Sequence, residues 1–331
     1  MQIQPLQVYR YIGAIVSGNP FPETSDHSQQ RNSRCSLNDS AKEPGGPGTE
    51  RPEWIKAKAP SGADFEEVLS LVQDLRLHTI CQSARCPNIG ECWRERTATF
   101  LILGEVCTRN CGFCAVRSGK PASVDEQEPE RVAHAAQSLA LKYAVVTSVT
   151  RDDLPDGGAS VFAETIRAIK QRLPDCSVEV LIPDFKGSRN ALQAVVDARP
   201  DVLNHNVETV PRMYSLIRRQ ADYATSIRLL RWVKEMGSSV ITKSGIMVGV
   251  GETSDEIIQT MRDLRDAGCE ILTIGQYLRP SFDHAPISRY YTPEEFESFR
   301  LAGMDMGFRH VESGPLVRSS YHAARAVTLT E

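Results

Sequence analysis

The sequence predicts an α/β protein: a partial, six-stranded parallel β/α barrel with an N-terminal and a C-terminal extension. Two observations lead to this fold. From residue 99 onward, short and almost continuously apolar runs alternate with amphipathic helical patterns, which is typical of parallel strands covered by helices. This unit occurs six times, whereas a closed barrel of this kind has eight.

Residues 1–50 are predicted to be a disordered extension. They are rich in Ser, Gln, Asn, Pro and Gly, and this composition buries too little apolar surface to offset the entropy of the chain. A targeting role is less favoured, because Arg10 is the only basic residue of the stretch 4–16 and acidic residues follow it. An over-long start assignment would also account for the extension.

The segment 51–98 is expected to form an extension that precedes the barrel and carries cysteines. Of the nine cysteines in the chain, six lie in two triplets: Cys81, Cys86 and Cys92, then Cys107, Cys111 and Cys114. The second triplet follows the first predicted strand directly. The remaining cysteines are isolated and no role is expected for them: Cys35, Cys176 and Cys269.

Residues 99–308 are expected to form the barrel. Its strands are expected at 100–103, 144–150, 178–183, 202–208, 240–249 and 271–277. Its helices are expected at 129–141, 159–172, 189–198, 221–236, 254–267 and 293–306. The segment 309–331 follows as the C-terminal extension. Because the carboxyl ends of parallel strands carry the chemistry of such folds, the loop of the second triplet lies at the expected site.

Composition excludes several functional classes. The hydrophobic fraction of 41% and the charged fraction of 24% are ordinary for a soluble globular protein. A net charge of -4 gives no electrostatic basis for nucleic-acid binding. No apolar stretch approaches the roughly 20 residues that span a bilayer. Clustered cysteines without a secretory signal indicate a reducing compartment, so a cytoplasmic location is expected.

The chemistry of the triplets favours iron–sulfur clusters. Three thiolates can hold three irons of a cubane cluster and leave the fourth iron open. A structural zinc site normally has four protein ligands, and neither triplet has a fourth Cys or an adjacent His. A redox dithiol would fit Cys111 and Cys114 but would not need Cys107.

Three stretches resemble known motifs. The second triplet resembles the signature of radical S-adenosylmethionine (SAM) enzymes. The stretch 84–93, Ala-Arg-Cys-Pro-Asn-Ile-Gly-Glu-Cys-Trp, resembles the auxiliary-cluster motif of the lipoyl synthase family. The stretch 314–323, Gly-Pro-Leu-Val-Arg-Ser-Ser-Tyr-His-Ala, is similar to the C-terminal serine motif of that family. The chain departs from the family pattern at Gln82-Ser83 and at 282–285, outside the cysteine and serine motifs.

The resemblance implies a reaction, cofactors and partners. The reaction would be that of a sulfurtransferase, which inserts two sulfur atoms at C6 and C8 of a protein-bound octanoyl-lysine. The implied cofactors are two 4Fe–4S clusters and SAM. The implied partners are octanoylated lipoyl carrier domains, namely 2-oxoacid dehydrogenase E2 subunits and the glycine cleavage H protein, with reduced ferredoxin or flavodoxin as electron donor. Neither nucleic acid nor a membrane is expected as a partner.

By the same resemblance, the two triplets have different tasks. Cys107, Cys111 and Cys114 would hold the SAM-binding cluster and act in catalysis. The first triplet, in the extension, would hold the auxiliary cluster and supply sulfide. Ser320 of the C-terminal segment would close that cluster as its fourth ligand and share in catalysis. The alternative for Ser320 or its neighbour Ser319 is an N-cap of a short helix.

The expected SAM contacts are Phe113, Ser148, Asn206 and Glu208. Phe113 lies between two cysteines, where a plain packing role fits equally well. The other three end the second and fourth predicted strands, where short polar side chains also serve as caps.

Four arginines suit either contacts to an acidic carrier or a solvated helix face: Arg218, Arg219, Arg228 and Arg231. Two functional alternatives remain. Another two-cluster radical SAM sulfur-transfer enzyme, such as a methylthiotransferase, would share the triplets, although no basic RNA-binding patch supports it. A non-enzymatic iron–sulfur sensor or carrier would need neither six β/α units nor an open iron.

Overall fold

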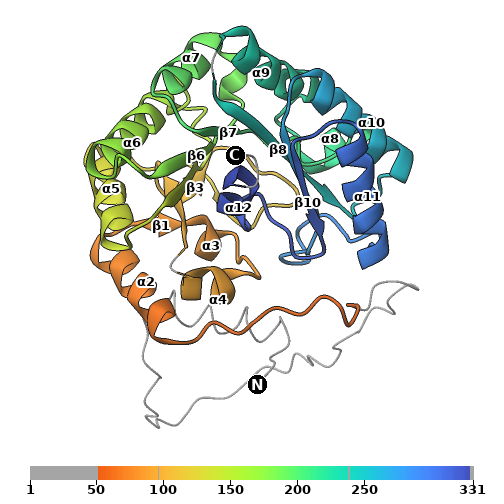
Figure 1. The fold of residues 1–331 in the computed structure, drawn as a ribbon, viewed down its shortest axis with the longest axis horizontal. Helices are drawn as coiled ribbons and strands as arrows, with labels where there is room; N and C mark the ends of the chain where they lie inside the picture. Colours follow the sequence, from red (N-terminus) through yellow and green to blue (C-terminus); the bar gives the residue numbers. More distant parts are fainter. Residues whose placement is uncertain (1–50, 96, 238, 329–331) are drawn as a thin grey trace, which may run out of the picture.

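The computed structural model describes residues 51–95, 97–237 and 239–328. The disorder expected at 1–50 and the isolated Cys35 lie outside the described residues. Within the described part, the chain forms one sheet of eight strands in the order β1-β2-β5-β6-β7-β8-β9-β10. The sheet curves into an open barrel with its helices on the outside (Figure 1). The predicted fold class is confirmed.

Six strands of the sheet are the predicted ones, and two more extend it. The bounds are β1 His78–Thr79, β2 Thr99–Ile102, β5 Tyr143–Ser148, β6 Ser177–Leu181, β7 Val202–Asn204, β8 Ile241–Val248, β9 Ile271–Gln276 and β10 His310–Gly314. β1 pairs antiparallel with β2, and β10 pairs parallel with β9. The prediction missed both edge strands because β1 has two residues and β10 has one buried side chain among five.

The outer ring consists of the six predicted helices, each within three residues of its expected bounds: α5 Glu128–Ser138, α6 Ala159–Arg172, α7 Arg189–Asp197, α9 Tyr223–Glu235, α10 Ser254–Asp266 and α11 Pro293–Asp305. Side chains at their N-termini explain where several begin. Ser188 caps α7 and Asp222 caps α9, while Thr253 and Thr292 start capping boxes at α10 and α11. Among the described residues, no helix is long and apolar enough to cross a bilayer.

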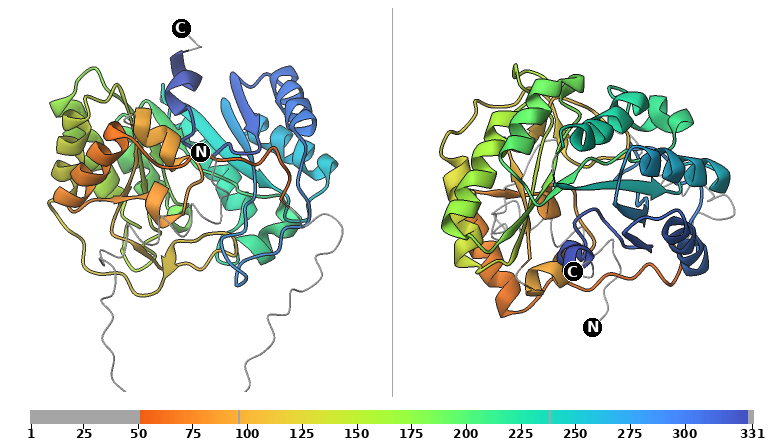
Figure 2. Two further views of the ribbon diagram at one scale, coloured as in Figure 1. Left: turned by 90° about the horizontal axis from the view of Figure 1, so that it is seen from below. Right: turned by 45° about the horizontal axis from the view of Figure 1, so that its top comes forward.

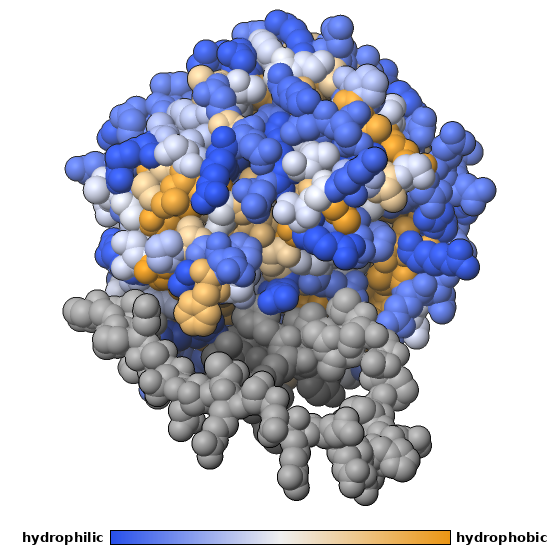
Figure 3. Space-filling view, turned by 180° about the vertical axis from the view of Figure 1, so that it is seen from behind, coloured by the Kyte–Doolittle hydropathy of each residue, from blue (hydrophilic) through white to orange (hydrophobic). Residues whose placement is uncertain are grey.

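The remaining elements carry the two extensions and the loops of the site. They are α2 Ala63–Asp74, α3 Ile80–Ser83, α4 Ile89–Cys92, η1 Trp93–Glu95, β3 Val106–Cys107, β4 Arg117–Ser118, η2 Phe185–Gly187, η3 Pro211–Met213, α8 Tyr214–Ile217 and α12 Ala323–Thr328. The loops that follow the strands gather on the face away from α12 (Figure 2, left). Viewed from behind Figure 1, the surface is mostly hydrophilic with small apolar patches (Figure 3).

The two extensions meet at the open edge of the barrel, between β1 and β10 (Figure 1). The side chain of Asn88 donates to the carbonyl of Leu316 at 2.7 Å. The C-terminal segment also passes close over β9, where a Cβ on Gly275 would lie 2.1 Å from the carbonyl oxygen of Val317. Only glycine tolerates that approach. Segments far apart in sequence therefore line the same end of the site.

Candidate active site

A single cavity of about 350 Å³ inside the barrel is bordered by cysteines from both triplets. Its walls include apolar side chains from the barrel strands and the loops that follow them: Val145, Leu181, Ile182, Met247 and Leu278. The second triplet lines it together with Phe113, and the C-terminal Ser319 and Ser320 also line it. The cavity therefore connects the two places where clusters are expected.

The first triplet is gathered by two short helices. Cys81 lies in α3, Cys92 ends α4, and all three thiols border a small hollow that Ser320 also lines. The Ser320 hydroxyl accepts a hydrogen bond from Thr99 Oγ1 at 2.9 Å. This contact joins positions 221 residues apart. The fold thus brings the predicted fourth ligand to the predicted three.

The thiols of the first triplet form no disulfide; Cys81 is buried, and Cys86 and Cys92 are partly buried. Burial raises the pKa of Cys81 to about 11, and a neighbouring Cys86 thiolate raises it further. The pKa values of Cys86 and Cys92 are raised by burial as well. Iron binding requires thiolates and releases their protons. Cationic iron would offset the repulsion between the three neighbouring thiolates, so the site fits an iron–sulfur cluster.

The second triplet lies on the loop that follows β2. Burial raises the pKa of Cys111 to about 11 and that of Cys114 to about 12. Hydrogen bonds from two other loops hold this segment: Gly112 N–H donates to the carbonyl of Ile217, and His284 Nε2 donates to that of Cys114, both at 2.9 Å. These contacts hold the cysteine loop against the barrel.

No three His, Cys, Asp or Glu side chains in the described ranges converge closely enough to hold a single metal ion. The six cysteines of the triplets are free of disulfides. Each triplet instead borders a hollow. This arrangement suits a multi-iron group, whose cysteine sulfurs bind different irons.

The polar side chains at the strand ends face the cavity. Ser148 ends β5, and its buried hydroxyl has no hydrogen-bond partner within the described part of the chain. Asn206 donates to Glu208 at 3.1 Å and to Ser319 Oγ at 2.6 Å, while its own amide oxygen is buried and unpaired there. Burial raises the pKa of Glu208. Leaving such groups unsatisfied costs about 1–3 kcal/mol each, which favours a polar ligand.

The structure adds His205, which the sequence placed at a strand end without assigning it a role. His205 is 1% exposed, and its Nδ1 lies 2.9 Å from the carbonyl oxygen of Ile182. Burial and the nearby Arg218 lower its pKa to about 4, so the ring is neutral near pH 7. Because Nδ1 must donate to a carbonyl, Nε2 is a bare acceptor. It lines the cavity wall without a partner in the described chain.

Arg218 was expected on the surface, either as a contact to an acidic carrier or as part of a solvated helix face, and this expectation is wrong. It is 8% exposed and lines the cavity instead of covering a solvated surface. Its guanidinium donates to the carbonyl of Asn206 at 3.0 Å and lies 3.1 Å from the hydroxyl of Tyr214. Arg218 follows α8, a helix of four residues, and so short a helix shows no periodicity from which its inner face could be predicted. The other three arginines are exposed.

Comparisons with known proteins agree on one family. The family model described as the radical SAM superfamily matches residues 101–264, and the one described as the N-terminal domain of lipoyl synthase matches residues 20–86. A lipoyl synthase of Rubrobacter xylanophilus is 61% identical over 273 residues, covering 82% of this chain and 85% of that protein. A lipoyl synthase of Caldanaerobacter subterraneus subsp. tengcongensis is 56% identical over 279 residues, covering 84% and 98%.

One solved structure is similar in fold. The crystal structure of HydG, a maturase of the FeFe-hydrogenase, has a TM-score of 0.50 and 13% identity, covering 70% of this chain and 62% of that one. At this identity the likeness concerns the barrel architecture alone.

Proposed function

The chain belongs to the lipoyl synthase family of the radical SAM superfamily, and we propose which of its residues carry out the reaction. The enzyme is a sulfurtransferase that inserts two sulfur atoms at C6 and C8 of a protein-bound octanoyl-lysine. It uses SAM and two 4Fe–4S clusters. The observation that carries the assignment of residues is the shared cavity, which is bordered by the second triplet and by Cys81 and Cys86 of the first.

Cys107, Cys111 and Cys114 are the proposed ligands of the SAM-binding cluster. When bound, that cluster supplies the electron that cleaves SAM. The three thiols border the cavity beside Phe113, and this arrangement supports the proposal. The contribution of the chain is to fix the loop, bury the site and exclude water from the reactive species.

Two of the proposed SAM contacts, Ser148 and Asn206, each have a buried polar atom without a partner in the described chain. Ser148 Oγ can donate or accept, and Asn206 Oδ1 can only accept. Glu208, Phe113 and now His205 join them around the same space. Because His205 Nε2 accepts, the ligand group that it meets must be an N–H or O–H donor. The alternative of helix capping is less favoured, since the next helix N-caps are Gly158 for α6 and Val210 for η3.

Cys81, Cys86, Cys92 and Ser320 are the proposed ligands of the auxiliary cluster, which is the source of sulfide. A hard alkoxide is a poorer partner for iron than a soft thiolate. Ser320 would therefore hold its iron more weakly than the three cysteines hold theirs, which would suit a cluster that supplies sulfide. The contact of Ser320 with Thr99, beside the first triplet, supports this role.

The organisation of the chain follows from these roles. Residues 99–308 form the proposed catalytic barrel, and 51–98 with 309–331 form the parts that hold the auxiliary cluster. The apolar cavity wall suits an octanoyl chain, with E2 subunits and the H protein as proposed carriers.

A reduced ferredoxin or flavodoxin is the proposed electron donor. Its access is supported by the partial exposure of the loop that carries Cys111 and Cys114. We place the enzyme in the cytoplasm, because reduced cysteines persist in a reducing compartment.

Mass spectrometry of an octanoylated lipoyl domain tests the function. After anaerobic incubation with reconstituted protein, reductant and SAM, the domain should gain two sulfur atoms and lose two hydrogens. An unchanged mass together with release of 5′-deoxyadenosine would remove the lipoyl assignment and favour another two-cluster radical SAM sulfur-transfer enzyme. Absence of both products and of SAM binding would favour the iron–sulfur sensor or carrier.

A further inference from the structure

We propose that Arg109 is a positioning residue that clamps the loop of the second triplet to the ends of two barrel strands. The inference rests on the proposed role of Cys107 and Cys111 as cluster ligands. Arg109 lies between these two cysteines in sequence and is 7% exposed. A fully charged side chain is seldom buried in this way unless it is paired.

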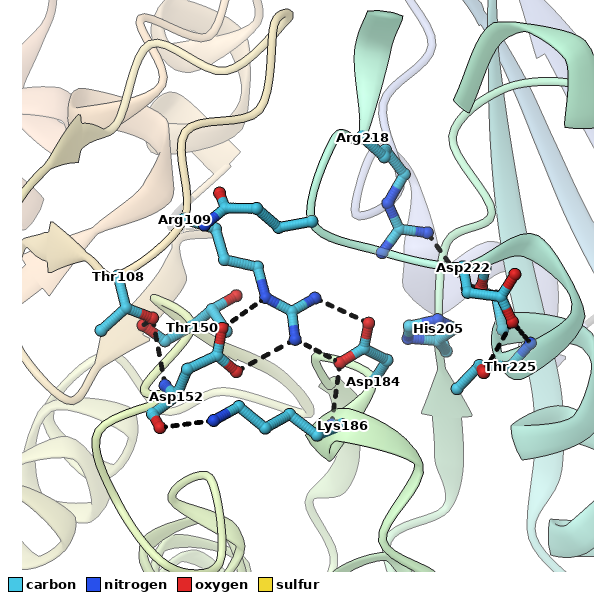
Figure 4. A network of polar contacts seen from close by, with 12 residues as sticks. Thr108, Arg109, Thr150, Asp152, Asp184, Lys186, His205, Arg218, Asp222 and Thr225 are labelled. Atoms are coloured by element: carbon cyan, nitrogen blue, oxygen red, sulfur yellow. Dashed lines mark hydrogen bonds and ion pairs between the residues drawn. The ribbon is translucent and has the colours of Figure 1, made fainter. Parts of the chain in front are cut away.

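Two aspartates hold the Arg109 guanidinium, each through two hydrogen bonds. Nε and Nη2 donate to Asp152 at 2.7 and 3.0 Å, and Nη1 and Nη2 donate to Asp184 at 2.6 and 2.7 Å. Figure 4 shows the guanidinium between the two carboxylates. This double fork requires the planar group of arginine, because an ammonium cannot donate in parallel to two carboxylates.

The two aspartates belong to different strand ends. Asp152 lies on the loop after β5, and Asp184 caps η2 after β6. Burial opposes ionisation of Asp184, but hydrogen bonds from Arg109 hold its pKa at about 2. The side chain of Lys186 donates to the carbonyl of Asp152 at 2.7 Å and ties the two loops together (Figure 4). The clamp therefore spans three consecutive strand-end loops, which follow β2, β5 and β6.

The clamp also sets the surroundings of the Cys107 sulfur. Two backbone N–H groups point at that sulfur: Arg109 N at 3.4 Å and Thr150 N at 3.3 Å. Thr108 Oγ1 donates to the Thr150 carbonyl and accepts from Asp152 N–H, so both N–H groups lie on segments joined by the clamp. Hydrogen bonds to cluster sulfurs stabilise the more negative, reduced state and raise the reduction potential. By holding these two N–H groups against the Cys107 sulfur, Arg109 should raise the reduction potential of a cluster bound there.

The neighbouring Arg151 provides a matched control. It is also buried, at 2% exposure, and it pairs with Asp153 through 2.8 and 2.9 Å contacts. Its other hydrogen bonds reach the carbonyls of Leu103 and Ala122. None of these partners lies between Cys107 and Cys114, although Arg151 adjoins Asp152. If replacement by lysine acted only through the general loss of a buried, paired arginine, Arg109→Lys and Arg151→Lys should change the measured properties equally.

The experiment compares Arg109→Lys with Arg151→Lys in the full-length, anaerobically reconstituted protein. The readouts are iron per chain, the midpoint potential of the cluster whose electron paramagnetic resonance signal changes on SAM addition, and the SAM dissociation constant. For Arg109→Lys we expect a lower midpoint potential and SAM binding weakened by about 10-fold or more, the usual size of effects from groups that orient metal ligands. Arg151→Lys should match the parent in both.

Equal potentials and equal SAM affinities in Arg109→Lys and the parent would overturn the proposal, as would equal changes in both arginine variants. If Arg109→Lys does not fold, Asp152→Asn replaces it, because it removes one charge of the clamp and leaves Arg109 paired with Asp184. The midpoint potential and SAM affinity of Asp152→Asn are then compared with those of the parent and of Arg151→Lys in the same way. These readouts involve no octanoyl substrate, so failure of the clamp and failure of the lipoyl reaction are distinguishable.

Discussion

Replacing Cys111 by alanine should abolish release of 5′-deoxyadenosine from SAM. Two cysteines cannot hold the cluster in the form that leaves one iron for SAM. Anaerobic incubation with dithionite and SAM, followed by chromatography of the nucleoside products, measures the effect. The rate of 5′-deoxyadenosine release should fall at least about 100-fold. Removing a group that only orients a metal ligand typically costs about 10- to 100-fold, so loss of a ligand itself should cost at least as much.

Cys176→Ala is the matched control for this prediction. Cys176 is a buried core residue in the same barrel, remote in sequence from either triplet and without an assigned role. It should release 5′-deoxyadenosine at the rate of the parent. Cleavage of SAM by Cys111→Ala at more than a tenth of the parental rate would contradict the assignment of the second triplet.

Ser320→Cys should separate SAM cleavage from sulfur insertion. A fourth thiolate holds iron more firmly than the serine oxygen does, so the auxiliary cluster should form but resist dismantling. We expect 5′-deoxyadenosine release near the parental rate and lipoyl formation reduced by about 100-fold, in line with loss of a metal-site function. The ratio of 5′-deoxyadenosine to lipoyl product, measured in one reaction mixture, reports the separation.

Ser319→Ala is the comparison for Ser320→Cys. Ser319 lies next to Ser320 and accepts a hydrogen bond from Asn206 on the SAM side of the cavity. Its loss should leave the product ratio unchanged. If Ser320→Cys forms lipoyl product as fast as the parent, the lability argument for the serine ligand is wrong.

The sequence predicted the barrel well because its elements have strong periodicity. α6 was predicted with its observed bounds, Ala159–Arg172, since eight of its side chains are buried on one face. The edge strands β1 and β10 escaped prediction, because pairing with an already formed sheet stabilises strands that have little apolar pattern of their own. β7 is shorter than predicted: beyond Asn204, the polar residues turn toward the cavity and only Glu208 makes an isolated bridge with Ile246.

Only those parts of the site that are defined by short intervals between residues in the sequence could be predicted. The two triplets are recognisable from their short intervals, and the serine motif from its resemblance to a family. Arg109 was not identified, because its partners lie 43 and 75 residues further along the chain. Nothing in the sequence separates this buried arginine from an exposed one. His205 and Arg218 were missed for the same reason: their roles depend on which way a loop turns after its strand.

A sulfur-isotope measurement tests whether the cluster held by Cys81, Cys86, Cys92 and Ser320 supplies the inserted sulfur. The protein is reconstituted with iron and ³⁴S-sulfide, freed of excess sulfide, and allowed a single turnover on an octanoylated lipoyl domain. If this cluster is the sulfur source, both sulfurs of the lipoyl product are ³⁴S. Lipoyl product carrying unlabelled sulfur would contradict it and would require another sulfur donor.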